Sequence, residues 1–162
     1  MLDRLNDLQQ LAREKEPENK KFFQVLKKKR PSDLDTNFHN LHEEAFSEID
    51  CLECANCCKT TSPIFYVKDI DRLAKQLKMK SSDFIDKYLH IDEDGDYVLN
   101  SAPCAFLGPD NYCMVYESRP DACREYTHTN RRKMYQVLDL ALKNTFICPA
   151  VYSMVEKLKK LY

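Results

Sequence analysis

Apolar residues in the first third of the chain recur at helical spacing. Leucines stand every third position over residues 2–11, a second apolar group covers residues 22–26, and a third runs over residues 34–49 in steps typical of one helix face. Pro17 and Pro31 separate the three groups. The pattern therefore predicts three helices, divided at the prolines, whose apolar faces enter a core.

The basic run KKKR, residues 27–30, stands directly before the third group. Cations are favourable at the C-terminus of a helix, so this run is interpreted as the charged end of the second helix. Ser32 follows Pro31 and is the expected N-cap of the third helix.

The remainder of the chain mixes short apolar runs with turn residues. It contains only two glycines and no internal repeat, which favours a compact, helix-rich fold. The sequence predicts a mainly α fold with a small β component (α+β). The elements expected are an extended segment at 62–67, helices at 69–79 and 81–89 with Ser81 or Ser82 as cap, an extended run after Asp94-Gly95, a hairpin at 104–116, and helices from Pro120, over 131–143 and from Pro149.

The role expected for the cysteines depends on whether the protein's compartment keeps thiols reduced. The N-terminus carries charges every few residues and nowhere do eighteen apolar residues run together, so we expect neither a secretory signal nor a membrane span. The chain is predicted to be cytoplasmic, where thiols stay reduced. With 162 residues, 43% of them hydrophobic, the chain is long enough for an ordinary core without disulfides. Its eight cysteines therefore indicate metal binding or thiol catalysis.

Four of the cysteines fall within CLECANCC, residues 51–58. A Cys-x2-Cys spacing lets one turn present two sulfurs to an ion, and it occurs here twice in succession. The adjacent Cys57 and Cys58 have diverging side chains, which favours two centres, or one centre and a spare thiol. One partition puts Cys51, Cys54, Cys57 and Cys148 in one centre and Cys58, Cys104, Cys113 and Cys123 in the other.

These spacings suit two kinds of metal centre. Four thiolates can hold zinc tetrahedrally. Three cysteines at x2 spacing with a remote Cys-Pro, here Cys148-Pro149, are also typical of iron–sulfur ligation. Cys123 and Cys148 are expected near helix N-termini, which predicts lowered thiol pKa values for both.

Charge and histidine content change this interpretation little. The 25 basic and 26 acidic residues give a net charge of -1, which argues against nucleic acid and anionic membranes as partners. The cation Arg119 is expected to screen thiolates at Cys113 and Cys123. The four histidines, His39, His42, His90 and His128, are expected in the core or on the surface instead of at a metal.

The sequence resembles the YkgJ-like cysteine-cluster family, described as zinc- or iron-chelating. The resemblance is carried by CLECANCC, by CAFL at 104–107, by ICP at 147–149, and by a Cys-x-x-Tyr-x-x-Arg-Pro-x-x-Cys string. That string falls on Cys113, Tyr116, Arg119, Pro120 and Cys123. The resemblance covers roughly residues 46 to 152, and it implies an N-terminal helical extension at 1–45 and a cysteine-cluster metal-binding domain at 46–162.

We therefore expect a soluble protein that holds zinc or iron through up to eight thiolates. The alternative is an iron–sulfur redox or group-transfer protein, because related clusters occur in flagellin lysine methylases. With only Gly95 and Gly108, the chain has no glycine-rich fingerprint for a nucleotide-like cofactor, and no catalytic residue is assigned. A third class is a zinc-stabilised adaptor for nucleic acid or protein that uses residues 27–30 and 131–133; no particular protein partner is indicated.

Overall fold

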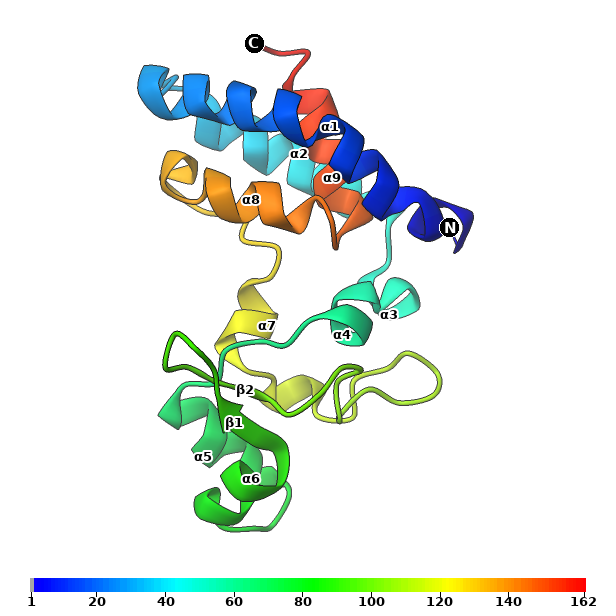
Figure 1. Cartoon of the computed structure of the whole chain (residues 1–162), viewed down its shortest axis with the longest axis vertical. Helices are drawn as coiled ribbons and strands as arrows, with labels where there is room; N and C mark the ends of the chain where they lie inside the picture. Colours follow the sequence, from blue (N-terminus) through cyan, green and yellow to red (C-terminus); the bar gives the residue numbers. More distant parts are fainter. Residues whose placement is uncertain (1) are drawn as a thin grey trace. The chain divides into compact units, whose positions relative to one another are not determined.

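The computed structural model describes the backbone of residues 2–162 and the side chains from residue 7 onward (Figure 1). Contacts divide the chain into two compact units. Unit 1 comprises Met1–Cys54 with Thr127–Tyr162, and unit 2 comprises Ala55–Tyr126. This grouping differs from the boundary expected after residue 45, because the N-terminal helices pack with the C-terminal ones.

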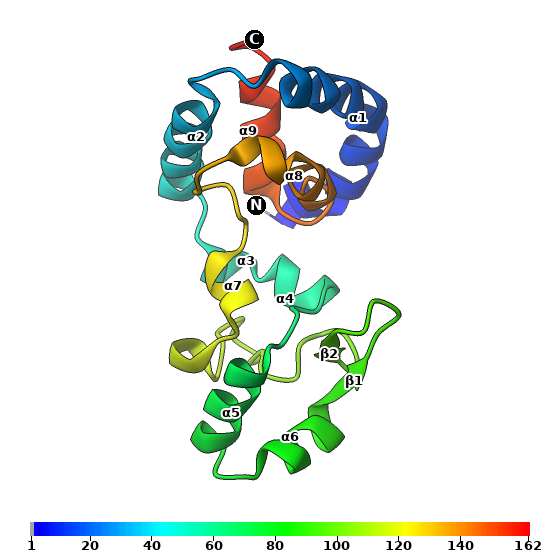
Figure 2. The same cartoon turned by 90° about the vertical axis from the view of Figure 1, so that its left-hand side faces the viewer.

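Unit 1 is a bundle of helices around α9. In Figures 1 and 2, α1, α2 and α8 surround α9, and each of the three contacts it. Val151, Met154 and Val155 on α9 are almost completely buried, as the hydrophobic pattern after Pro149 predicts. The elements are α1 (Leu2–Lys29), α2 (Leu34–Glu48), α3 (Cys51–Cys54), the 3-10 turn η2 (Met134–Gln136), α8 (Leu138–Asn144) and α9 (Pro149–Leu158).

The two helices predicted before residue 30 are one continuous helix, α1, with Pro17 inside it. A proline removes one backbone hydrogen bond. Burial on both sides of Pro17 offsets that loss, since Ala12 and Phe23 are almost fully buried. Leu8 is buried, but Leu11 is 40% exposed, so the leucine stripe is only partly the core face; Leu2 and Leu5 lie outside the described side chains.

Two further boundaries in unit 1 differ from the predictions. The N-cap position of α2 is Asp33 and not Ser32, and no side chain caps it. The helix predicted over 131–143 is divided at Val137 into η2 and α8. Asp35 of α2 accepts hydrogen bonds from the amides of Lys133 and Met134, which fixes the chain in a turn before η2.

Asn19 is a polar residue in the apolar core of unit 1. It is fully buried, and among the described residues neither its side-chain nitrogen nor its oxygen has a hydrogen-bond partner. An unsatisfied buried amide is unfavourable, so Asn19→Leu is expected to raise the free energy of unfolding by about 1 kcal/mol. Asn144→Leu is the matched control, because the buried Asn144 amide donates to Thr127 O and its loss is expected to lower stability by about 1–3 kcal/mol. Urea unfolding measures both changes, and a destabilised Asn19→Leu would contradict the expectation.

Unit 2 combines short helices with a two-stranded antiparallel sheet. Strand β1 pairs with β2 in the register Leu89 opposite Leu99, across a turn in which Gly95 has a φ of 86°. That positive φ is why glycine suits this turn. The elements are α4 (Asn56–Thr60), α5 (Val67–Gln76), α6 (Ser81–Tyr88), β1 (Leu89–Ile91), β2 (Tyr97–Leu99), the 3-10 turn η1 (Tyr116–Ser118) and α7 (Asp121–Glu125).

An aromatic core holds unit 2 together. The Phe84 ring stacks on Phe106 with centroids 6.0 Å apart and contacts Phe65 and Tyr88 at its other edges. Cys104 and Cys113 pack against this core. The loops that carry these two thiols therefore rest on a rigid apolar base.

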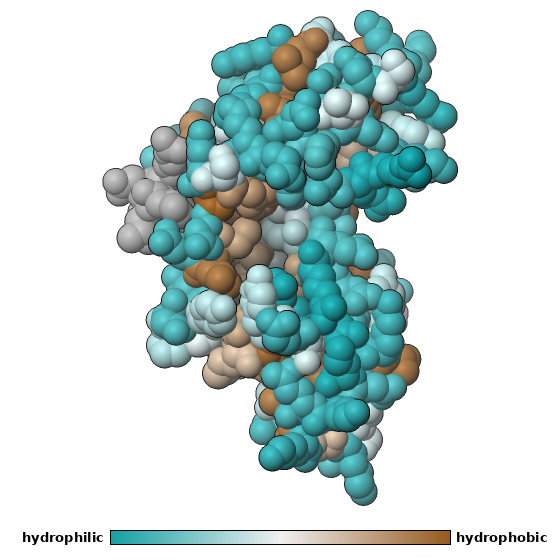
Figure 3. All heavy atoms as spheres, turned by 180° about the vertical axis from the view of Figure 1, so that it is seen from behind, coloured by the Kyte–Doolittle hydropathy of each residue, from teal (hydrophilic) through white to brown (hydrophobic). Residues whose placement is uncertain are grey.

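The mainly α class with a small β component is confirmed. The extended segment at 62–67, the turn at Asp94-Gly95 with the extended run after it, and the helices α5 and α9 lie where the sequence predicts them. Strand β1 is not predicted, because the sequence pattern places Leu89 in the helix before it. Hydrophilic residues cover most of the face shown in Figure 3. Within the described part of the chain, no helix combines the length and apolar character needed to cross a membrane.

Candidate metal centre

Unit 2 carries Cys57, Cys58, Cys104, Cys113 and Cys123. The first two lie on α4, which begins after Ala55 in the left-handed conformation, and Cys123 lies in α7. Cys104 and Cys113 lie in the loops between β2 and η1. All five are free thiols, and each is partly buried.

Backbone hydrogen bonds connect the segments that carry these thiols. The Cys104 amide donates to Cys58 O at 2.7 Å. The predicted hairpin at 104–116 is a narrow turn in which Leu107 bridges Cys113 and the Gly108 amide donates to Tyr112 O at 2.8 Å. Cys58, Cys104 and Cys113 are therefore held on one continuous hydrogen-bonded framework.

Backbone amides also point at two of the sulfurs. The Phe106 amide lies 3.4 Å from Cys104 Sγ, and the Leu107 amide assists it. The Val115 amide donates to Cys113 in the same way. Such amides stabilise a thiolate, which is the form that binds metal.

Four of the thiols interact electrostatically with one another. Burial and, to a smaller degree, its neighbours Cys58, Cys104 and Cys113 together raise the pKa of Cys123 to about 12. The pKa of Cys58 is raised first by a hydrogen bond with Cys57, whose Sγ is 4.0 Å away, and then by burial. Cys58, Cys104, Cys113 and Cys123, the second set of the predicted partition, are thus neighbours in the structure. Cys57 lies beside Cys58.

The lowered pKa values predicted for Cys123 and Cys148 are wrong. Burial raises the pKa of Cys148 to about 12, although the amides of Val151 and Ala150 oppose this shift. Loss of hydration therefore outweighs the helix N-terminus at both thiols. For Cys123 the helix α7 is also only five residues long, so its dipole is small.

Arg119 supplies positive charge to this group of thiols. Its guanidinium lies 3.5 Å from the centre of the Tyr116 ring, and its Nε donates to Tyr116 O at 2.8 Å. It lowers the pKa values of Cys58, Cys113 and Cys123 against the larger effect of burial. Tyr116 is thus the platform that orients Arg119 towards the thiols.

An ion pair between the buried Asp69 and the partly exposed Arg72, which the sequence did not reveal, holds the turn before Cys123. Asp69 is fully buried and accepts hydrogen bonds from Arg72 at 2.6 Å and from the Asp121 amide at 3.1 Å. Arg72 donates in addition to Arg119 O at 2.7 Å and to Ser118 O at 3.3 Å. The acid at the third position of α5 is visible in the sequence, but its partners lie some fifty positions away.

Unit 1 carries Cys51, Cys54 and Cys148. Cys51 and Cys54 are one helical turn apart on α3, and Cys148 is the N-cap residue of α9, as predicted. Cys54 and Cys148 are buried, whereas Cys51 is exposed. Both α3 thiols act on Cys148 and raise its pKa, so these three members of the first predicted set share one region.

The thiols described in the structure do not form a preorganised metal site. Within the described residues, no three His, Cys, Asp or Glu side chains already form a metal-holding group. The raised pKa values of five thiols mean that these five are neutral at pH 7, and neutral sulfurs have no cause to converge; they are Cys58, Cys104, Cys113, Cys123 and Cys148. Tetrahedral zinc would place its sulfurs about 3.8 Å apart, given Zn–S bonds of about 2.3 Å.

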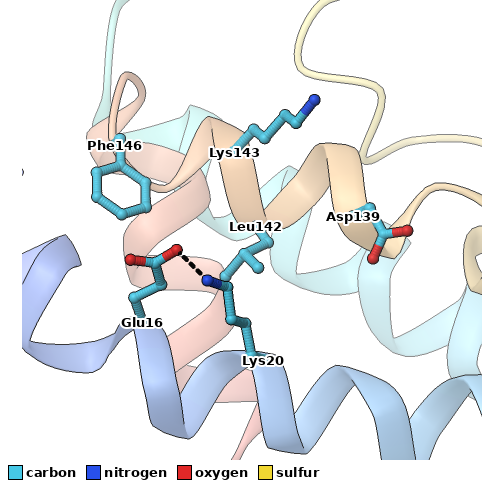
Figure 4. Close-up of a pocket in the computed structure, with 6 residues that line it drawn as sticks. All are labelled: Glu16, Lys20, Asp139, Leu142, Lys143 and Phe146. Atoms are coloured by element: carbon cyan, nitrogen blue, oxygen red, sulfur yellow. Dashed lines mark ion pairs between the residues drawn. The ribbon is translucent and has the colours of Figure 1, made fainter.

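Unit 1 contains a hollow of about 520 Å³. It is lined by Leu142, Lys143, Phe146 and the ion pair of Glu16 with Lys20, and no cysteine lines it (Figure 4).

Two histidines of α2 have hydrogen-bond partners in the loop before η2. His39 bonds to Asn130, and His42 bonds to Thr129. These two histidines therefore connect α2 to the loop after residue 127.

Residues 50–144 match the model of the CxxCxxCC family, described as a "putative zinc- or iron-chelating domain". The chain belongs to the CxxCxxCC family. The match covers more than half of the chain and confirms the resemblance drawn from its cysteine motifs. No curated protein and no solved structure matches it significantly. Metal chelation is thus the activity that membership of the CxxCxxCC family supports, with zinc and iron both compatible.

The raised thiol pKa values predict how the stability of the metal-free, reduced protein depends on pH. Cys123 titrates near 12 in the fold and at its ordinary value of 9.0 when unfolded. Its contribution is therefore complete below pH 9.0 and is lost as the pH rises towards 12. We expect the free energy of unfolding to fall by about 1.4 kcal/mol per pH unit for this thiol across that window. Urea unfolding of the apo protein at pH 8, 9 and 10 measures the slope. Cys123→Ala should reduce it, and an unchanged slope would contradict the assignment.

Proposed function

We propose that the chain is a metal-binding protein whose unit 2 holds a zinc ion through Cys58, Cys104, Cys113 and Cys123. The observation that carries this proposal is that Cys123 has the other three thiols as its electrostatic neighbours. All four proposed ligands are thiols, and soft thiolate sets favour zinc over hard cations. Loading releases protons as the thiols become thiolates.

The surroundings of the four thiols fit this role. Amides at Phe106 and Val115 and the guanidinium of Arg119 stabilise negative sulfur. Burial disfavours negatively charged thiolates, and a bound dication would supply the positive charge that offsets this cost. The Asp69–Arg72 pair and the aromatic core keep the ligand loops in position.

A second candidate function concerns unit 1. Cys148-Pro149 lies near Cys51 and Cys54, which are two of the three cysteines at x2 spacing that, with a remote Cys-Pro, are typical of iron–sulfur ligation. On this candidate, unit 1 holds an iron–sulfur cluster through these three thiols and takes part in electron or group transfer. No residue is assigned a catalytic role.

Elemental analysis of protein purified without oxygen tests both candidates. The zinc proposal predicts colourless protein with about one equivalent of zinc retained by unit 2, lost on acidification as the thiolates are protonated. Brown protein with iron and acid-labile sulfide supports the iron–sulfur candidate. Protein that retains neither metal after reconstitution contradicts both.

A further inference from the structure

Two basic runs that are far apart in the sequence lie at one end of unit 1. The first, residues 28–30, closes α1, and the second, residues 131–133, precedes η2. In Figure 1 the end of α1, the start of α2 and the turn before α8 occupy the same side of this unit. We call this surface the basic end; its members are Lys28, Lys29, Arg30, Arg131, Arg132 and Lys133.

Specific contacts fix the two runs beside each other. The Arg30 guanidinium lies 4.5 Å from the centre of the Tyr135 ring, which belongs to η2. Asp35, in the first turn of α2, accepts the amide of Lys133 at 2.7 Å and that of Met134 at 2.8 Å. Asp35, which follows the first basic run, thus holds the second run by the backbone amide of Lys133.

The charge of the basic end is largely uncompensated. All six of its side chains are exposed, and none of them is in an ion pair within the described structure. Neighbouring Lys27 and Asp139 neutralise each other, and Asp33 and Asp35 are the acids in the segment that follows the first run. Six cations minus two acids give a local charge of about +4, whereas the whole chain has -1.

We propose that the basic end is a docking surface for single-stranded nucleic acid. Phosphates match exposed lysines and the forked guanidinium groups of arginine. Arg30 is exposed with its guanidinium against the Tyr135 ring, and a planar guanidinium held in this way can stack on a base. The net charge near zero argued against such a partner when only the sequence was considered. A total charge, however, does not register that the fold brings two basic runs together.

The test is a fluorescence-anisotropy titration of the full, metal-loaded chain with a labelled oligouridine of about 20 nucleotides, repeated over a series of salt concentrations. Four phosphate contacts predict a slope of log K against log salt of about -3. The fourfold variant Lys28→Gln, Lys29→Gln, Arg131→Gln, Arg132→Gln is expected to bind at least about tenfold more weakly, with a much shallower slope. Arg30 is kept because its guanidinium packs on Tyr135 of η2, and Lys133 is kept because its backbone amide anchors the turn on Asp35.

A control variant removes the same formal charge from exposed lysines of unit 2: Lys75→Gln, Lys78→Gln, Lys80→Gln and Lys87→Gln. The control is expected to bind like the wild-type chain. Equal losses in the two variants would overturn the proposal, as would absence of binding at about 50 mM salt, where such contacts are strong. Binding to phosphatidylserine vesicles without binding to the oligonucleotide would also overturn it, in favour of a membrane surface. None of these outcomes depends on which metal the thiols hold.

Discussion

Cys123→Ser is expected to abolish zinc retention by unit 2 and to lower the stability of that unit by several kcal/mol. Cys123 is the thiol with three thiol neighbours, so its loss leaves an incomplete set of three. Binding at structural zinc sites contributes on the order of 10 kcal/mol to folding, and a site with one ligand removed keeps only part of this. Zinc content and thermal unfolding, measured in the presence of a competing chelator, report the two effects.

Cys57→Ser is the matched control for this substitution. Cys57 lies 4.0 Å from Cys58 but is outside the proposed ligand set. We expect the Cys57→Ser variant to retain the unit 2 zinc. The ligand assignment is wrong if Cys57→Ser loses that zinc while Cys123→Ser keeps it.

The second large effect is expected at the ion pair of Asp69 with Arg72. Asp69→Ala removes the acceptor of Arg72, of the Asp121 amide and of the Tyr66 amide. Arg72 is partly exposed and keeps Asp121 as a partner, so the loss comes mainly from the two backbone amides that are left without an acceptor, at about 1–3 kcal/mol each. The turn before Cys123 is then no longer held, so we also expect zinc to dissociate faster. Urea unfolding and the rate of zinc transfer to a colorimetric chelator measure the two consequences.

Asp71→Ala controls for loss of an acid on the same helix. Asp71 is exposed and accepts a hydrogen bond from Ser81 Oγ. Its removal is expected to change stability by less than about 1 kcal/mol and to leave the zinc off-rate unchanged. Similar effects of the two substitutions would show that Asp69 does not position the site.

Elements with strong local signals were predictable from the sequence. The α5 and α9 helices have clear apolar faces, the Asp-Gly turn requires a positive φ, and Pro149 marks the start of a helix after Cys148. Continuity of α1 through Pro17 was not predictable, because burial of Ala12 and Phe23 against distant helices decides it. Tertiary packing there overrides a local helix breaker.

Site chemistry was predictable only in part. The spacing of the cysteines indicated metal binding and two sets of thiols. The sign of the pKa shifts at Cys123 and Cys148 depends on burial, which the sequence does not reveal. The partners of Asp69 and Arg72 are likewise set by the tertiary fold, since Arg72 binds carbonyls at Ser118 and Arg119.

X-ray absorption at the zinc edge tests the central claim most directly. The sample is the variant Cys51→Ser, Cys54→Ser, Cys148→Ser, reduced and loaded with one equivalent of zinc, so that only the thiols of unit 2 remain. Four thiolates predict a single shell of four sulfurs at about 2.3 Å. A shell dominated by nitrogen or oxygen, or a variant that retains no zinc, would contradict the claim that Cys58, Cys104, Cys113 and Cys123 bind one ion together.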